Sequence, residues 1–279
     1  MKVNKTIKLY IGGKLTRTES GRSFAILDKN SKHYAHVCHG SRKDFRNAVD
    51  LSISAAVNWS SQTAFLRSQI LYRMAEMMES KKSEFCNVLT ETTNLTKEKA
   101  EIEVKEAINH LVYYSGFCDK YQQILGAVNP VSGPFHNFTT AESVGVVTLV
   151  TDNTTKFSKL IEDISVIILS GNSVVTLIMP KLAAILAPLS EVLATSDLPS
   201  GVVNLISCYY EELSSFVSTH REVRSVSFQR SSIEEYAKFK SEGMDNMKRV
   251  VGNFDDKKDS LFKISQFLEY KTVWHPIGI

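Results

Sequence analysis

Apolar residues in the first third of the chain recur at the three- and four-residue spacing of amphipathic helices. Ser41 precedes one such run and is followed three positions later by Asp44, which predicts a helix start with a capping box. A long run over residues 97–123 predicts a third helix. The predicted buried stripes are Phe45, Val49, Ile53 and Ala56; then Leu66, Ile70, Met74, Met77 and Met78; then Val104, Ile108, Leu111 and Val112.

Short β-type segments lie on either side of these helices. Residues 9–11 lead into Gly12 and Gly13, which predicts a strand ending in a tight turn, and residues 24–27 and 34–37 predict two strands around another turn. After the helices, prolines and glycines among short β-type stretches at residues 126–140 predict an extended arm or hairpin, not a linker between independent domains.

From residue 144 onward, short apolar strands alternate with helices. This rhythm predicts an α/β fold with a doubly wound parallel sheet, covered on both faces and binding ligands at the carboxyl ends of its strands. The predicted strands are Val144–Val150, Ser173–Ile178, Val202–Ile206, Val223–Phe228 and Lys248–Val251. The predicted helices are Lys156–Leu169, Leu182–Thr195, Glu211–Thr219 and Ile233–Glu242.

The last segment, residues 255–279, begins charged and ends β-like. We expect a terminal strand over residues 270–277, because apolar residues gather there: Tyr270, Val273, Trp274 and Ile277. An unpaired apolar edge strand is an aggregation hazard, so this strand is predicted to pair with something.

The composition excludes several classes of protein but does not identify a function. The chain has 279 residues with 33 basic and 30 acidic side chains, so its net charge of +3 gives no electrostatic footprint for nucleic acid. No apolar stretch approaches the roughly 20 residues of a membrane span. The N-terminus lacks an apolar signal segment, and the four cysteines show no CxxC spacing. We therefore expect a reduced, soluble, cytoplasmic protein.

Common catalytic motifs are absent from the sequence. There is no GxGxxG, no P-loop, no GxSxG elbow and no HExxH. Three histidines and a cysteine cluster at His33, His36, Cys38 and His39. In a regular strand His33 and His39 share one face while His36 points to the other, which disfavours a shared metal ion, so no metal site is predicted.

Several loose motifs, in the right order, resemble those of the aldehyde dehydrogenase superfamily. LSGNSVV at residues 169–175 is similar to the family's AAGNTVV, and DLPSGVVN at 197–204 is close to its GLPxGVVN. SVGVV at 143–147 and YYSG at 113–116 are similar to the family's PxGVV and YYAG. The resemblance extends from residue 8 to about residue 254 and implies a Rossmann-like cofactor-domain fold.

The departures from the family's pattern bear on catalysis. The family's substrate-polarising Asn corresponds to Thr154, and its general base Glu corresponds to Asn253, which cannot take up a proton. The nucleophilic Cys lies further on in the family. Here the chain ends 26 residues after Asn253 and its last cysteine is Cys208, so the catalytic domain is predicted to be absent.

Cofactor positions also depart from the family. The Lys that contacts the adenosine ribose corresponds to Leu177, in a segment that continues to Pro180. The FTGS turn that accepts the pyrophosphate reads Phe228, Gln229, Arg230 and Ser231, and the Arg230 side chain occupies space that the family keeps open. We expect no cofactor, or weak NAD binding at most.

The tail is similar to a narrower group, the second and incomplete copy of the dehydrogenase unit in aldehyde dehydrogenase family 16. This resemblance implies a cofactor-type domain over residues 1–254 with an oligomerisation arm at 123–141, and a C-terminal segment, 255–279, with an oligomerisation strand at 270–277. We predict a catalytically inactive domain that acts in oligomerisation or protein interaction. The partner would be a second copy or a full-length dehydrogenase unit, bound through Tyr270, Val273, Trp274 and Ile277.

The sequence is also compatible with two other functions. One is a regulatory nucleotide-binding domain, in which Arg230 would hold a phosphate. The other is a fragment of a larger NAD-dependent aldehyde dehydrogenase whose catalytic unit lies elsewhere.

Overall fold

A computed structural model describes residues 5–252 and 260–278 and places a seven-stranded sheet at the centre of the molecule. The strands are, in spatial order, β12 (Arg249–Gly252), β11 (Ser225–Phe228), β8 (Val146–Val150), β9 (Ser173–Ile178), β10 (Val203–Ser207), β2 (Leu9–Ile11) and β3 (Lys14–Thr16). The first five pair in parallel, while β2 joins β10 antiparallel, with Leu205 opposite Tyr10. The predicted doubly wound α/β fold is confirmed, with an added hairpin edge that turns at Gly12 and Gly13.

Helices alternate with the parallel strands as the pattern predicted. They are α6 (Phe157–Ile168), α7 (Leu186–Thr195), α8 (Tyr210–Thr219) and α9 (Ile233–Glu242), with 3-10 turns η1 (Pro180–Ile185) and η2 (Met244–Asn246). The predicted helix 182–195 is wrong over residues 182–185. These residues belong to the 3-10 helix η1, and the α-helix begins only at Leu186.

The N-terminal helices differ more from prediction. They are α1 (Arg42–Ser60), α2 (Ala64–Ser80), α3 (Lys82–Thr92), α4 (Lys97–Ser115) and α5 (Tyr121–Leu125). The single helix predicted over 97–123 is wrong, because α4 ends at Ser115 and the Gly116 N–H caps its last turn. Helix α3 was not predicted; Lys81, at its start, provides no side-chain cap, so the start signal is missing.

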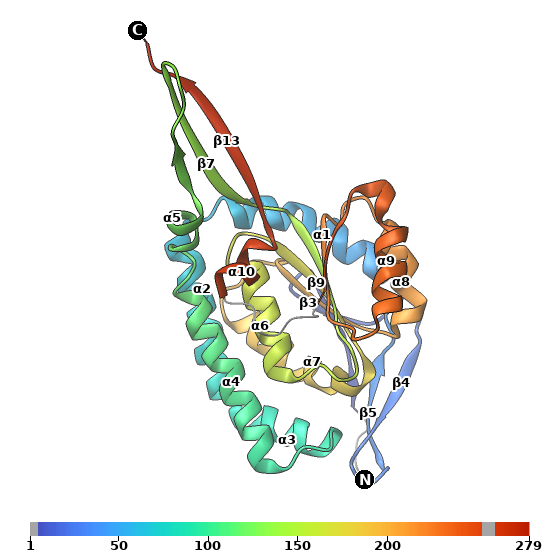
Figure 1. Cartoon of the computed structure of the whole chain (residues 1–279). Helices are drawn as coiled ribbons and strands as arrows, with labels where there is room; N and C mark the ends of the chain where they lie inside the picture. The colour runs from blue at the N-terminus through green and yellow to red at the C-terminus, as the bar shows by residue number, and fades with distance from the viewer. Residues whose placement is uncertain (1–4, 253–259, 279) are drawn as a thin grey trace.

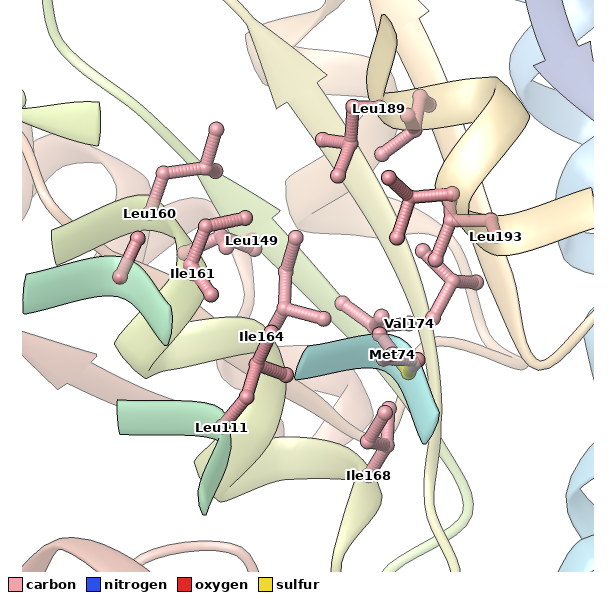
Figure 2. Packing of buried hydrophobic residues seen from close by; sticks show 14 of the residues in the cluster. Met74, Leu111, Leu149, Leu160, Ile161, Ile164, Ile168, Val174, Leu189 and Leu193 are labelled. Carbon is pink, nitrogen blue, oxygen red and sulfur yellow. The ribbon is translucent and has the colours of Figure 1, made fainter. Parts of the chain in front are cut away.

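Helix α6 lies within the larger of the two hydrophobic core clusters of the described residues. Figure 2 shows Leu160, Ile161, Ile164 and Ile168 of α6 among side chains from α2, α4, α7 and the sheet. The indole Nε1 of Trp59, on α1, donates to the Ile168 carbonyl at 2.7 Å, and Arg67, on α2, donates to the Leu169 carbonyl. These bonds tie the N-terminal helices to the end of α6.

A second sheet projects from the body as an arm (Figure 1). It consists of β6 (Ala127–Asn129), β7 (Phe135–Ser143) and β13 (Leu268–Pro276), in the order β13-β7-β6, and the short helix α10 (Ser260–Ser265) precedes β13. The predicted arm 123–141 begins too early, because residues up to Leu125 are helical, and it stops short of Ser143. The terminal strand was predicted at 270–277 and lies at Leu268–Pro276.

A third sheet, in the order β1-β5-β4, contains β1 (Thr6–Ile7), β5 (His33–Cys38) and β4 (Ser23–Leu27). Its register shifts between Ile26 and Leu27, which pair with Ala35 and His33 and so skip Tyr34. The predicted alternation of His33 and His36 is therefore wrong: the irregularity brings their rings to 4.5 Å.

No helix in the described part of the chain is long and apolar enough to cross a membrane.

Candidate functional site

The loops after β8 and β11 meet at the carboxyl edge of the sheet, where the strand order reverses between these two neighbouring strands. In doubly wound folds this reversal point is the usual ligand crevice. Here the Asp152 carboxylate accepts hydrogen bonds from the Ser231 backbone N–H at 3.3 Å and from its hydroxyl at 3.2 Å. The two loops are thus tied to each other across the crevice.

Arg230 fills the turn after β11 with a fully engaged side chain. Its Nε and Nη2 atoms donate to the two oxygens of Glu235 at 2.6 and 2.9 Å, a bidentate pair. The guanidinium carbon lies 4.2 Å from the centre of the Tyr210 ring. The Nη2 atom also lies 3.6 Å from the Oε1 atom of Glu211. The side chain is only 12% exposed, so it is part of the packed structure of the crevice.

The helix after this turn presents an N-terminus that is already neutralised. Ser232 caps α9 by accepting from the Glu235 N–H, and Glu234 and Glu235 both lie in the first turn. An acidic first turn opposes the positive end of the helix dipole. The N-terminus of α9 therefore offers little attraction to a phosphate.

The other predicted cofactor positions present no polar side chain to the crevice. Leu177, in β9, and Phe228, at the end of β11, are both fully buried in the core. Pro180 begins η1.

Thr154 lies exposed in the turn after β8, at the mouth of a cavity of about 390 Å³. The cavity also reaches α4, α6, α10 and the loop after β11, through His110, Lys159, Glu162, Lys263 and Gln229. Its lining is made of polar and charged residues. Asn253, the predicted counterpart of the base, is outside the described residues.

A buried charge network forms one wall of this cavity. Glu162, on α6, accepts from Lys159 at 3.1 Å, from Lys263 of α10 at 2.7 Å and from the Tyr114 hydroxyl at 3.0 Å. Burial raises the pKa of Glu162, but the two ammonium groups outweigh it and lower the pKa to about 2. Glu162 therefore stays ionised.

Asp163, the next residue on α6, behaves in the opposite way. Burial raises its pKa to about 6, although Lys159 donates to its Oδ1 atom at 2.6 Å. Among the described residues its Oδ2 atom and Gln229 Oε1 have no hydrogen-bond partner, and both residues line a small hollow of about 40 Å³. A hollow of this size is large enough to hold one water.

No cysteine is placed as a nucleophile at this edge. All four cysteines, Cys38, Cys86, Cys118 and Cys208, are free and buried. Burial raises the pKa of Cys118 to about 12 and also raises the pKa of Cys208. The raised pKa keeps the Cys118 and Cys208 thiols protonated at neutral pH, and a protonated thiol is a poor nucleophile. The described residues contain no group of three or more His, Cys, Asp or Glu arranged for a metal ion.

Sequence reasoning missed Glu235 and the charge network. The five-residue step from Arg230 to Glu235 crosses a loop and half a turn of helix, so no periodic pattern marks it. Lys159, Glu162 and Asp163 are spaced three and four residues apart on one helix, which does signal a charged cluster. Nothing local indicates that Lys263, about 100 residues later, joins it.

The arm is the second candidate site. Antiparallel pairing places β13 along the whole length of β7, from Leu268 opposite Ser143 to Pro276 opposite Phe135. The outer edge of β13 has no strand partner among the described residues. Large side chains on β13 and on the residue that follows it remain exposed: Tyr270 is 48%, Val273 42%, Trp274 59% and Ile277 52% accessible.

Comparison with known proteins places the chain in a family. The model of the aldehyde dehydrogenase family matches residues 16–255. A putative aldehyde dehydrogenase, DhaS, from Bacillus subtilis is 26% identical over 253 residues, and an omega-crystallin from Enteroctopus dofleini is 24% identical over 249. Each alignment covers 88% of this chain and 50% of the relative, so the chain spans about half the length of these proteins.

Solved structures show the same fold. An aldehyde dehydrogenase from Bacillus cereus in complex with NAD+ superposes with a TM-score of 0.82 at 21% identity, covering 89% of this chain and 50% of that protein. A betaine aldehyde dehydrogenase from Staphylococcus aureus, also in complex with NAD+, gives 0.82 at 22% identity, with coverages of 88% and 49%.

Proposed function

The chain belongs to the aldehyde dehydrogenase family, and from this premise we propose that it is a catalytically inactive, aldehyde-dehydrogenase-like domain that acts in oligomerisation or protein interaction. The proposal includes the finer resemblance to the incomplete second copy of family 16. It places the protein in the cytoplasm, in keeping with four buried cysteines that form no disulfide.

The observation that carries the proposal is the arm. A nine-residue strand from the tail pairs with β7 and leaves Trp274 and Tyr270 about half exposed. Burying an aromatic of this size contributes roughly 1.5–3 kcal/mol, and Trp and Tyr are enriched at the energetic centres of interfaces. A long exposed edge of this kind favours association with a second copy or with a full-length dehydrogenase unit.

The crevice supports the inactive half of the proposal. Arg230 and Glu235 fill the turn that the family resemblance leaves open for a diphosphate, and Leu177 offers no polar atom to a ribose. Thr154 stands where the resemblance expects a substrate-polarising Asn, and no cysteine is activated. Each of these features concerns a different part of the reaction, and together they support inactivity.

Two measurements test the proposal. The purified chain should produce no NADH or NADPH from aldehydes with NAD or NADP. Turnover by the unaltered chain would contradict the assignment, and its loss when the four cysteines are replaced by Ser would identify a cysteine nucleophile. In light scattering the intact chain should be a dimer or larger, while a version stopped at Leu268 should be monomeric. A clean monomer for the intact chain, equally stable after truncation, would exclude an assembly of identical copies.

A second candidate function is a domain of a longer NAD-dependent aldehyde dehydrogenase. It is favoured by one observation, the coverage of only about half of each matched relative. The activity would then require a catalytic unit from outside this sequence. Turnover that appears only when this chain is mixed with a separate catalytic domain that is inactive by itself would support that alternative.

A further inference from the structure

The irregular pairing of β4 and β5 brings two histidines together. Regular alternation separates residues three apart, such as His33 and His36, onto opposite faces of a strand. Here Ala25 pairs with His36 and Ile26 with Ala35, but Leu27 pairs with His33, so Tyr34 is the extra residue. The rings of His33 and His36 consequently lie 4.5 Å apart, inclined at 50°.

Both imidazoles are available for binding. His33 is exposed and His36 half-buried, and within the described residues neither side chain makes a hydrogen bond or an ion pair. The other two members of the sequence cluster are engaged elsewhere. Cys38 is buried in the core, and His39 packs between Phe24 and Tyr209.

We propose that His33 and His36 form a two-histidine site for a borderline divalent cation, of the class Zn²⁺, Ni²⁺ or Cu²⁺. Imidazole nitrogen is a preferred ligand for these ions. Each ring nitrogen would lie about 2.0–2.1 Å from the ion, which puts two ring centres bound at a right or tetrahedral angle roughly 4.5–5 Å apart. The observed separation of 4.5 Å lies at the lower end of this range.

The site differs from a closed structural zinc site in its coordination. With two protein ligands, the remaining positions belong to water, so binding is reversible and moderate in strength. Its position on β5 sets it apart from the crevice at the carboxyl edge of the large sheet. The proposed metal site therefore does not depend on the proposed function.

The test uses ZnCl₂ and NiCl₂ added to the full chain, followed by isothermal titration calorimetry and, for zinc, by the ring-proton NMR signals of the histidines. One equivalent should bind, and the signals of His33 and His36 should shift together. Replacing either one, His33→Ala or His36→Ala, should weaken binding by roughly 10–100-fold, at least the effect of losing a supporting contact at a metal site.

The arm supplies a control, because His136 and His275 also lie close together, although as cross-strand partners and not on one strand. The His275→Ala variant should bind the metal as the unaltered chain does. Absence of binding by the unaltered chain, binding lost in His275→Ala, or binding unchanged in both His33→Ala and His36→Ala would each overturn the proposal. Circular dichroism and the unfolding midpoint without metal show that each variant is folded, and His36→Gln provides a second, closer replacement at the less exposed position.

Discussion

Arg230 shows what one substitution does to a binding turn. The sequence indicates a bulky side chain where a diphosphate would approach, but the structure adds its partner, because Glu235 holds the guanidinium through two hydrogen bonds. Removing Arg230 alone would leave the Glu235 carboxylate unpaired beside the N-terminus of α9. That negative charge would repel a phosphate.

The first prediction follows from this pair. The unaltered chain should bind NAD weakly or not at all, and Arg230→Gly alone should change little. The double variant Arg230→Gly/Glu235→Gln should gain affinity by about tenfold or more, since it removes both the bulk and the charge. Isothermal titration measures this, with Arg230→Gly/Glu234→Gln as the matched control. Low-micromolar binding by the unaltered chain would show that the crevice is not blocked.

A second prediction concerns the pH dependence of stability at Asp163. Its pKa is raised to about 6 by burial, so the folded state holds this proton more tightly than the unfolded chain. The contribution of Asp163 is most favourable below about pH 4 and is lost as the pH rises through about 6. Relative to the unaltered chain, Asp163→Asn should therefore gain roughly 2–3 kcal/mol of unfolding free energy between about pH 4 and about pH 7.5.

Urea unfolding at several pH values measures this gain. The control is Glu162→Gln, for which the change in unfolding free energy should have the opposite sign. The pKa of Glu162 is lowered to about 2, so its ionised form stabilises the fold above about pH 4.5 and that contribution disappears as the pH falls toward 2. Glu162→Gln should be destabilised throughout the neutral range. A stability difference for Asp163→Asn that does not vary with pH would refute the assigned titration.

At the scale of elements, features that depend on neighbouring residues could be predicted from the sequence. Features that depend on contacts between distant residues could not. The capping box of α1 was predicted from Ser41 and Asp44 alone, and both of its hydrogen bonds are present. The irregularity at Tyr34 depends on how two strands pair, which no local pattern encodes. The break after Ser115 is a C-cap at Gly116, hidden because apolar and aromatic residues continue beyond it.

The third prediction tests the cap of α1. Asp44 accepts from the Ser41 N–H at 2.8 Å and also from the Thr18 hydroxyl and the Glu19 N–H, so it joins the helix to the preceding loop. Asp44→Ala should destabilise the protein by about 2–4 kcal/mol, from the lost cap and the donors left unpaired. Asp50→Ala, an exposed position in the same helix, should stay within about 0.5 kcal/mol. Chemical denaturation would disprove the role if both variants were equally stable.

At the scale of the whole molecule, the alternation of strands and helices was enough to predict the parallel sheet and the edge at which its crevice lies. Alternation does not encode which distant segments meet. The tail contributes Lys263 to the charge network and β13 to the arm, and both contacts span more than 100 residues. The terminal strand was expected to need a partner, and the structure gives it one in the same chain, β7, while its other edge has none among the described residues.

The arm has two faces, and the four apolar residues predicted for its interface are divided between them. Tyr270 and Trp274 are an even number of residues apart and share one face, where Phe135 packs edge-on against Trp274. Val273 lies on the opposite face, directly across from Phe138, which in turn pairs with Val128. The aromatic face is the better candidate for the covered one, because interfaces favour Trp and Tyr over Val.

The last prediction uses this division, since neighbouring residues on opposite faces serve as controls for each other. Trp274→Glu should convert the assembly to monomer by placing a charge within the buried aromatic face, whereas Val273→Glu, on the other face, should leave the mass in light scattering unchanged. Each variant should keep its fold, because both side chains are about half exposed in the single chain. Dissociation by Val273→Glu alone would assign the interface to the Val128 face, and assembly that survives both substitutions would remove the arm from the interface altogether.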